Sequence, residues 1–204
     1  MSDARVIIGG VAAAAVAVGA AFFLYVKSTG SASAAEDGPG PNLVIEVAGE
    51  ANGAITIDLL PDIAPKHVAQ VTELARRGAY DGVVFHRVIE GFMAQTGDVQ
   101  NGKAGGDLSL AGTGASDLPN IPAEFSEHSF MRGVVGMARS ADPDSANSQF
   151  FIMFAPGEFL NGQYTVIGHV IGGMEVVDAI KKGNPDLNGT VSEPDRMVKV
   201  TVED

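Results

Sequence analysis

From residue 42 onward the chain consists of short apolar runs separated by glycines, and this pattern limits the folds that it can form. In residues 197–203 apolar and polar side chains alternate after Met197, as expected of a strand with one buried face. The chain contains 26 glycines, which suit the tight corners and bulges between such strands. The same reasoning predicts strands at 43–47, 54–60, 83–86, 93–97, 133–138, 149–154 and 164–171.

Two segments have the spacing of a helix instead. Pro65 begins a predicted helix that continues to about residue 77 and ends at Gly78. A second, shorter helix is predicted at 174–182, where Gly183 follows it. Many short strands with only two helices indicate a mostly-β domain, either an antiparallel barrel or a sandwich.

The N-terminal segment has a different character. Residues 6–26 carry no charge, and as a helix this run would be about 31 Å long, close to the hydrocarbon thickness of a bilayer. We therefore predict that residues 1–27 form a hydrophobic helix that acts as a transmembrane anchor or a signal peptide. The length of the run favours an anchor, whereas the small residues at 32–34 fit a cleavage site, so both interpretations stay open.

The next residues predict how the chain is divided. Residues 28–41 are rich in Gly, Ser, Ala and Pro, which is typical of a flexible linker. The remaining segment, 42–204, has the length of one domain. If the N-terminus stays in the cytoplasm, both an anchor and a signal peptide would place this domain on the other side of the membrane, and an anchored chain would contact the membrane through residues 6–26.

Composition excludes several classes of function. The 13 basic residues are outnumbered by 25 acidic ones, and a net charge of −12 disfavours binding to nucleic acid. The absence of cysteine excludes thiolate nucleophiles and cysteine-ligated metals. The four histidines lack metal-ligand spacing, and no G-x-S-x-G or G-x-G-x-x-G motif is present. We therefore expect chemistry that needs no metal, nucleotide or covalent nucleophile.

Three ordered motifs remain. They are VFHRVIEGFMAQTGD at 84–98, RGVVGMARSADPDSANSQFFI at 132–152 and FLNGQYTVIG at 159–168. In this order and separation they resemble the cyclophilin family of peptidyl-prolyl cis/trans isomerases, and the resemblance extends over about residues 43–202. It implies a closed eight-stranded antiparallel β-barrel with an α-helix at each end, rotation about X–Pro peptide bonds, and no cofactor.

The chemistry of that reaction suits one arginine in the first motif. Rotation about the peptide bond has a barrier of about 18–20 kcal/mol because resonance is lost. The twisted transition state exposes a lone pair on the proline nitrogen, so a fixed donor aimed at it stabilises this state selectively. Arg87 matches the catalytic arginine of the family, and a guanidinium is always charged and rich in donors.

The resemblance also implies a substrate-binding site. An apolar pocket would hold the proline ring, two glutamines would bind the substrate backbone, and the 138–139 segment would contact the peptide chain mostly through backbone groups. In contrast, we expect Phe150 to point into the core, His86 to be structural, and Asp142 and Asp144 to be solvated. The implied pocket residues are Phe92, Met93, Phe151 and Leu160, and the implied backbone-binding residues are Gln95, Gln149, Ala138 and Arg139.

Three positions resemble the bacterial variety of the family. Arg139 stands where many members have Asn, Phe159 where the best-known eukaryotic members have Trp, and Tyr164 where they have a His that lines the pocket. Because Phe159 lacks the indole N–H, we expect cyclosporin binding to be weakened. A bacterial source would place the domain at the periplasmic face of the inner membrane if anchored, or in the periplasm if the signal is cleaved.

Two functions from different classes follow from this pattern. The first is an isomerase that helps exported, Pro-containing client proteins to fold. The second is a chaperone or binding module that holds Pro-containing segments without turnover. The presence of Arg87 together with the pocket residues favours the isomerase, because a module that only binds has no need for the arginine. We expect a monomer in either case.

Overall fold

The computed structural model describes residues 36–204. The predicted anchor or signal peptide and residues 28–35 of the predicted linker lie outside the described residues. Among residues 36–204, no helix is both long and apolar enough to cross a membrane. The end of the predicted linker contacts the domain, because Leu59 donates a backbone hydrogen bond to Pro41 and Gly38 donates one to the carboxylate of Asp58.

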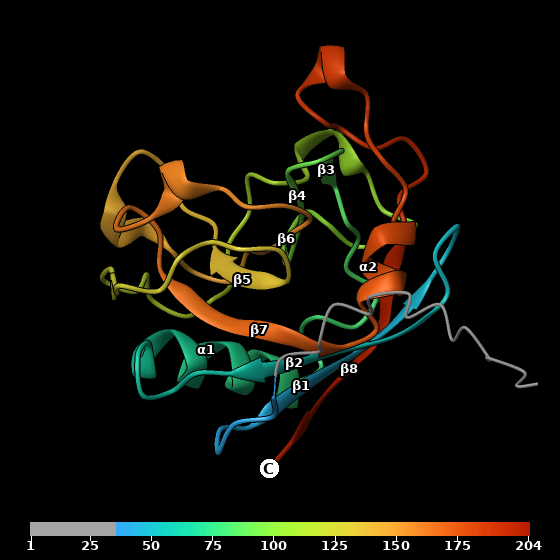
Figure 1. The fold of residues 1–204 in the computed structure, drawn as a ribbon. Coiled ribbons are helices and arrows are strands. Elements are labelled where there is room, and N and C mark those ends of the chain that lie inside the picture. The colour runs from blue at the N-terminus through green and yellow to red at the C-terminus, as the bar shows by residue number, and fades with distance from the viewer. Residues whose placement is uncertain (1–35) are drawn as a thin grey trace, which may run out of the picture. The chain divides into compact units, whose positions relative to one another are not determined.

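The domain is mostly β, as predicted, and contains two α-helices and four short 3₁₀ helices (Figure 1). The strands are β1 (Asn42–Ala48), β2 (Gly53–Leu59), β3 (Arg87–Ile89), β4 (Met93–Thr96), β5 (Val134–Met137), β6 (Phe150–Met153), β7 (Val166–Gly172) and β8 (Arg196–Glu203). The helices are α1 (Pro65–Arg76), α2 (Met174–Ala179), η1 (Leu108–Leu110), η2 (Pro143–Ser145), η3 (Glu158–Leu160) and η4 (Pro185–Leu187).

Two predictions about the sheet are wrong, namely the strand at 83–86 and the closure of the barrel. The eight strands form one antiparallel sheet in the order β3-β4-β6-β5-β7-β2-β1-β8, and within residues 36–204 the edge strands β3 and β8 share no ladder. The sheet is therefore an open, curled half-barrel rather than a closed barrel. Residues 83–86 do not form the predicted strand. Val83 and Val84 form only isolated bridges, and the bridge of Val84 is to Arg196.

The physical reason for the open edge lies in the neighbour of β3. The backbone N–H of Val88 donates to Gly189 at 2.8 Å, and its carbonyl accepts from Gly183 at 2.9 Å. A loop after α2 thus uses the hydrogen-bonding edge that β8 would need for closure. Only a few bonds join the two ends of the sheet, such as that from Phe85 to the carbonyl of Asp195 at 2.9 Å.

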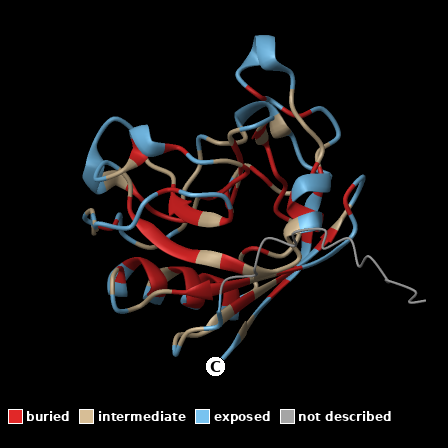
Figure 2. Ribbon diagram, viewed as in Figure 1, coloured by how far each residue is buried: buried red, intermediate tan, exposed pale blue. Residues whose placement is uncertain are grey.

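The main core lies between the curled sheet and α1 (Figure 2). Pro65 begins α1, as predicted, because its missing N–H is not needed at that position. No side chain at the helix start caps it; instead the carboxylate of Glu124 accepts from the backbone N–H groups of Lys66 and His67, both at 3.1 Å. Gly78 ends the helix with φ of 67°, a left-handed conformation that favours glycine.

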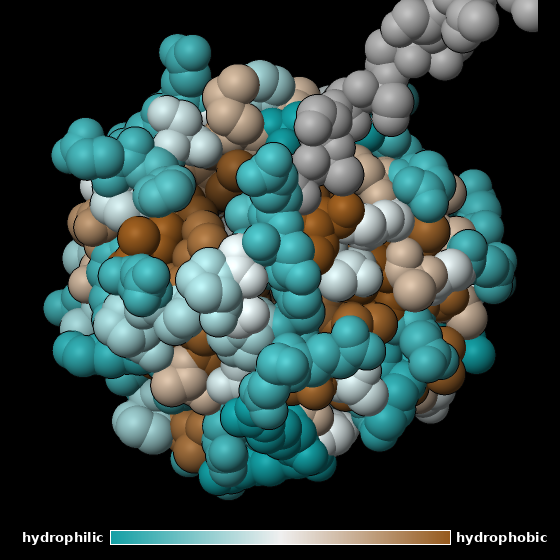
Figure 3. Space-filling model, turned by 60° about the horizontal axis from the view of Figure 1, so that its bottom comes forward, coloured by the Kyte–Doolittle hydropathy of each residue, from teal (hydrophilic) through white to brown (hydrophobic). Residues whose placement is uncertain are grey.

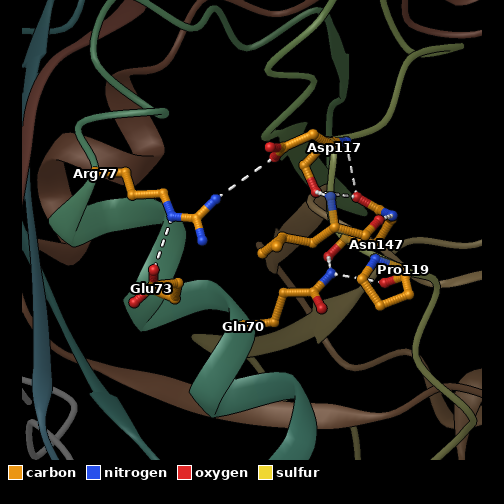
Figure 4. Close-up of polar contacts among 8 residues, drawn as sticks. Gln70, Glu73, Arg77, Asp117, Pro119 and Asn147 are labelled. Carbon is orange, nitrogen blue, oxygen red and sulfur yellow. Dashed lines mark hydrogen bonds and ion pairs between the residues drawn. The ribbon is translucent and has the colours of Figure 1, made fainter.

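The polar side of α1 holds a neighbouring loop in place (Figure 4). The side-chain amide of Gln70 donates to the carbonyls of Pro119 and Asn147, at 3.2 and 3.1 Å. Arg77 lies 3.6 Å from Asp117 in the same loop. The helix therefore fixes the loop that passes beside the site described below.

The surface is polar, with apolar side chains scattered over it. Figure 3 shows hydrophilic residues spread across one face, with hydrophobic atoms visible in the gaps between them. Single exposed apolar residues of this kind, such as Val198 on β8 at 43% exposure, are normal in folded proteins. This face gives no sign of an extended apolar patch.

Candidate active site

Ten of the eleven residues implied by the sequence motifs line a single cavity of about 290 Å³, called here the apolar pocket. The eleventh, Gln149, is hydrogen-bonded to one of them, Gln95, and lines an adjoining cavity of about 400 Å³. The lining residues of the apolar pocket are Arg87, Phe92, Met93, Gln95, Ala138, Arg139, Phe151, Phe159, Leu160 and Tyr164.

The register of the sheet brings the central residues together. Arg87 on β3 lies directly opposite Gln95 on β4, Gln95 lies opposite Phe151 on β6, and Phe151 lies opposite Gly136 on β5. Residues directly opposite one another point to the same face of a sheet. Met93, two residues before Gln95, shares this face because side chains alternate along a strand. Four strands therefore present one continuous row to the pocket.

Gly136 supplies the space that this row needs. A Cβ at this position would lie 2.5 Å from the ring of Phe130 and 2.6 Å from that of Phe151. The rings of Phe130 and Phe151 stack at 5.8 Å between centroids. A larger residue would push Phe151 out of its place in the pocket wall.

The floor of the pocket is buried and apolar, and its rim is exposed. Met93, Phe151 and Leu160 belong to a hydrophobic cluster separate from the main core. Phe159 is 64% exposed, and its ring lies 5.4 Å from that of the half-buried Phe92. A non-polar ring entering the pocket would therefore lose contact with water on several sides.

Three hydrogen bonds fix the guanidinium of Arg87 beside this floor. Nη1 donates to Oε1 of Gln95 at 3.2 Å, while Nε and Nη2 donate to the carbonyl and Oδ1 of Asn188, both at 3.1 Å. Burial lowers the pKa of Arg87 below its ordinary value, but a guanidinium stays charged at neutral pH. Of the five N–H donors of the group, three bond to these oxygen atoms and a fourth, on Nη1, contacts the sulfur of Met93 at 3.8 Å, so one N–H on Nη2 remains free.

A chain of amides continues from Arg87 to a loop. Nε2 of Gln95 donates to Oε1 of Gln149 at 3.0 Å, and Nε2 of Gln149 donates to the carbonyls of Gly112 and Gly114, at 3.1 and 2.9 Å. The loop itself is organised by the buried carboxylate of Asp98. It accepts four backbone N–H groups, including those of both glycines.

The opposite wall contains a second arginine. The guanidinium of Arg139 lies 4.3 Å from the ring centroid of Tyr164 and donates to the carbonyl of Gln163 at 2.9 and 3.2 Å. The backbone N–H of Ala138 donates to the carbonyl of Gln149 at 2.9 Å. These contacts hold the 138–139 segment against the pocket.

The residues that were expected outside the site do not line the apolar pocket, although His86 lines a cavity next to it. Phe150 is buried in the main core and contacts Tyr80 edge to face. His86 is buried, its ring nitrogens have no hydrogen-bond partner in the part of the chain that the structure describes, and burial lowers its pKa. Asp142 and Asp144 are exposed, and they accept backbone hydrogen bonds in and near η2.

Sequence reasoning missed Asn188. The Asn-Gly pair at 188–189 is a turn signal, and Asn188 does adopt a left-handed conformation with φ of 53°. However, Asn188 is 101 residues from Arg87 in the chain, and no spacing rule connects the two. The residues from 36 to 204 contain no cluster of potential metal ligands.

Comparison with known proteins identifies the family. The family model described as cyclophilin type peptidyl-prolyl cis-trans isomerase/CLD matches residues 43–202. The chain belongs to this family. A probable peptidyl-prolyl cis-trans isomerase from Brucella suis is 53% identical to this cyclophilin over 191 residues, which cover 93% of this chain and 95% of the relative. Peptidyl-prolyl cis-trans isomerase-like 1 from Rhizopus delemar is 40% identical over 136 residues, 67% and 79% of the two chains.

Solved structures agree with the fold. The cyclophilin AquaCyp293 from Hirschia baltica matches with a TM-score of 0.66 and 26% identity, over 81% of this chain and 74% of that one. A Cryptosporidium parvum cyclophilin, solved in the presence of the dipeptide Ala-Pro, matches with a TM-score of 0.67 and 22% identity, over 80% and 99%. This cyclophilin is therefore a peptidyl-prolyl cis-trans isomerase with the family's fold.

Proposed function

We propose that this cyclophilin isomerises X–Pro bonds at the apolar pocket, with Arg87 as the catalytic residue, in proteins exported from the cytoplasm. The observation that carries the proposal is the position of Arg87. Its guanidinium is fixed by Gln95 and Asn188 at the edge of a buried apolar floor and retains one free N–H donor, on Nη2.

The geometry suits a reaction that only rotates a bond. Met93, Phe151 and Leu160 offer non-polar surface to the pyrrolidine ring, and a non-polar surrounding disfavours the charge-separated planar amide. As the bond twists, the proline nitrogen gains a lone pair that accepts from Arg87. This bond exists only in the transition state, so it lowers the barrier instead of tightening ground-state binding.

The polar side chains next to the pocket would hold the substrate backbone. Gln95 and Gln149 are linked to each other and to the loop carbonyls, so their orientation is fixed before substrate arrives. The segment at Ala138 and Arg139 borders both the apolar pocket and the adjoining 400 Å³ cavity. A peptide lying along this segment would place its proline over Phe151. Phe159, without an indole N–H, and Tyr164 complete the rim.

The proposed client class and location depend on the N-terminal segment. The uncharged run at 6–26 supports insertion or export, and an acidic, monomeric domain beyond the linker would reach clients that emerge from the membrane. Protease treatment of spheroplasts, with the mass of the protein measured, distinguishes the two forms. An anchored protein keeps residues 1–27, and a processed one lacks them; protection of the domain from protease would contradict export.

The direct test is the rate of cis/trans isomerisation of an Ala-Pro peptide with the purified full chain. We expect Arg87→Ala to lose about 10²–10³ in kcat/KM, by analogy with the removal of one transition-state donor. Arg76→Ala is the matched control, because Arg76 is an exposed arginine of α1 that pairs with Asp204. Full activity in a folded Arg87→Ala variant would disprove the role of Arg87, and peptide binding without turnover by wild type would indicate a binding module.

A further inference from the structure

A second cavity adjoins the apolar pocket at Arg87. It has a volume of about 340 Å³, and Arg87 and Gln95 line it as well as the apolar pocket. His86 also lines it, and the remaining lining residues come from two loops, within 108–113 and 188–194. We call it the loop cavity. Because Arg87 and Gln95 line both cavities, the two cavities adjoin at these side chains.

The lining of the loop cavity includes apolar side chains from both loops. Leu108 and Ala111 belong to the first loop, and Val191 and Pro194 to the second. These residues face a space next to the charged Arg87, so the cavity offers non-polar contact beside the proposed catalytic group. This combination suits a side chain of a bound peptide better than it suits a small charged ligand.

Both loops are held in place without a ligand. The first is fixed by Asp98, which accepts from the backbone of Gly112 at 2.7 Å. The second loop lies alongside β3. Val191 of the loop donates to the carbonyl of His86 at 3.1 Å, and Val88 of β3 donates to the carbonyl of Gly189 at 2.8 Å. Figure 1 shows the two loops beside β3, with η1 in yellow-green and η4 in red above it. A preformed cavity loses little entropy when it is filled.

The exposed apolar residues point to the same place. Among residues 36–204, the three large apolar side chains with the highest exposure are Phe159 at 64%, Leu187 at 61% and Leu110 at 59%. Phe159 lines the apolar pocket, Leu110 lies between two residues that line the loop cavity, and Leu187 precedes one. Apolar side chains that gather at connected cavities mark an interaction surface.

We propose that the loop cavity is a second substrate subsite, which takes an apolar side chain flanking the proline of the same client segment. Leu110 and Leu187 would cover that side chain on its solvent side. The proposal rests on the proposed isomerase site and sharpens its substrate class. Clients would be segments with a residue such as Leu, Met or Phe within a few positions of the proline, in contrast to prolines flanked only by polar residues.

The test uses the full chain and peptides with one Ala-Pro core. Each peptide carries either Leu or Ser at a single position, up to three residues before or after that core. We expect kcat/KM at one position to be about tenfold higher for Leu than for Ser, the usual effect of a small apolar group in a pocket. In the double variant Leu110→Ser/Leu187→Ser this ratio should fall below about threefold, while turnover of the all-Ala peptide is unchanged.

A second variant and a control make the result specific. Ala111→Phe, which narrows the loop cavity, should lower the ratio of kcat/KM for the Leu peptide to kcat/KM for the Ser peptide. Val198→Ser changes an exposed apolar residue on β8, away from both cavities, and should keep the full Leu preference. Equal kcat/KM for Leu and Ser at every position in wild type would overturn the proposal, as would a Leu preference that neither cavity variant reduces.

Calorimetric binding of the same peptides separates this proposal from the isomerase site. If wild type binds the Leu peptide more tightly and the double variant does not, the subsite is supported even when no peptide is turned over. That outcome would overturn only the proposed catalysis. Turnover of all peptides without any Leu preference would overturn only the subsite, and the absence of both would overturn both.

Discussion

The two cavities that meet at Arg87 are built in different ways. The apolar pocket rests on paired strands, where the register of β3, β4, β6 and β5 places Arg87, Gln95 and Phe151 in one row. The loop cavity is bordered by two loops, of which one is held by the side chain of Asp98 and the other by a few backbone hydrogen bonds to the edge of β3. Strand pairing fixes the position of a side chain through many backbone bonds, whereas a loop depends on a few.

This difference separates chemistry from selectivity. Rotation about X–Pro bonds is the same reaction in every client, and the site proposed for it stands on the rigid sheet. The features that would discriminate between clients lie on loops, which tolerate changes in length and sequence better than strands do. The comparison predicts that damage to the sheet-built pocket affects every substrate, while damage to the loops affects substrates unequally.

The largest expected effect is that of Asp98→Ala. Its buried carboxylate accepts four backbone N–H groups, and removing it leaves them without their partner. We expect a loss of roughly 3 kcal/mol or more in the free energy of unfolding, measured by denaturant titration. Asp107→Ala, at an exposed carboxylate that caps η1, is the control. Equal stability of the two variants would mean that the loop does not depend on Asp98.

Gly136→Ala tests the sheet-built pocket. The added methyl group collides with Phe130 and Phe151, and overpacking of a core costs about 1–3 kcal/mol. Activity should fall for every peptide, with and without a flanking Leu, because Phe151 is displaced. Gly172→Ala, at a site on β7 where a Cβ meets only ordinary contacts, should change neither stability nor activity. A Gly136→Ala variant with wild-type kcat/KM would show that the ring position is not critical.

Asn188→Gly tests how far a loop positions Arg87. Glycine keeps the left-handed backbone and the carbonyl that accepts from Nε, and removes only the Oδ1 contact to Nη2. We expect kcat to fall about three- to tenfold with KM and the melting temperature nearly unchanged. Asn188→Asp, which retains Oδ1, should restore most of kcat. A rise in KM at constant kcat would show that the side chain binds substrate instead of orienting Arg87.

The smallest expected effect is a loss of stability in mild acid. Burial lowers the pKa of both His67 and His86 below the ordinary value of 6.5, so the unfolded chain binds protons more readily than the folded one. Their contribution to stability is fully present above pH 6.5 and is lost as the pH falls through the lowered pKa values. Melting temperatures between pH 7.5 and 5 should show this decrease.

Single variants assign the acid effect to one region. His67 is a buried residue of α1 and contacts Glu124 at 2.6 Å, whereas His86 lines the loop cavity. If His67→Gln removes most of the pH dependence of the melting temperature, the effect arises at α1. If His86→Gln removes it, the effect arises beside the loops. His128→Gln changes an exposed histidine and serves as the control. An unchanged melting temperature across this pH range would contradict both assignments.

Much of the fold was predictable from local patterns. The apolar and polar pattern of 197–203 and the helical spacing after Pro65 gave the bounds of β8 and α1 nearly correctly. The pattern did not give the buried face of β8, because a bulge against β1 leaves Met197 and Val200 buried and Val198 exposed. The strand at 83–86 was wrong, since Val83 and Val84 are apolar and buried but form only isolated bridges. Apolar content reveals that a segment is buried but does not reveal what it pairs with.

The candidate site divides in the same way. Residues within the motifs, such as Arg87 and Phe151, could be named from the chain because one segment carries several of them in fixed order. Asn188 and the carbonyls of Gly112 and Gly114 could not, since they act through contacts between distant segments. The Asn-Gly pair at 188–189 predicts a turn, but nothing in the sequence predicts that this turn lies against β3.

The mostly-β class, the two helices, the family and the residues that line the apolar pocket could all be predicted from the chain, since they follow from its local order. The open sheet and the loop cavity beside Arg87 became evident only in the folded domain. Both depend on which distant backbone occupies the edge of β3, where Val88 bonds with Gly183 and Gly189. The packing of the whole domain determines whether this loop or β8 bonds to the edge of β3.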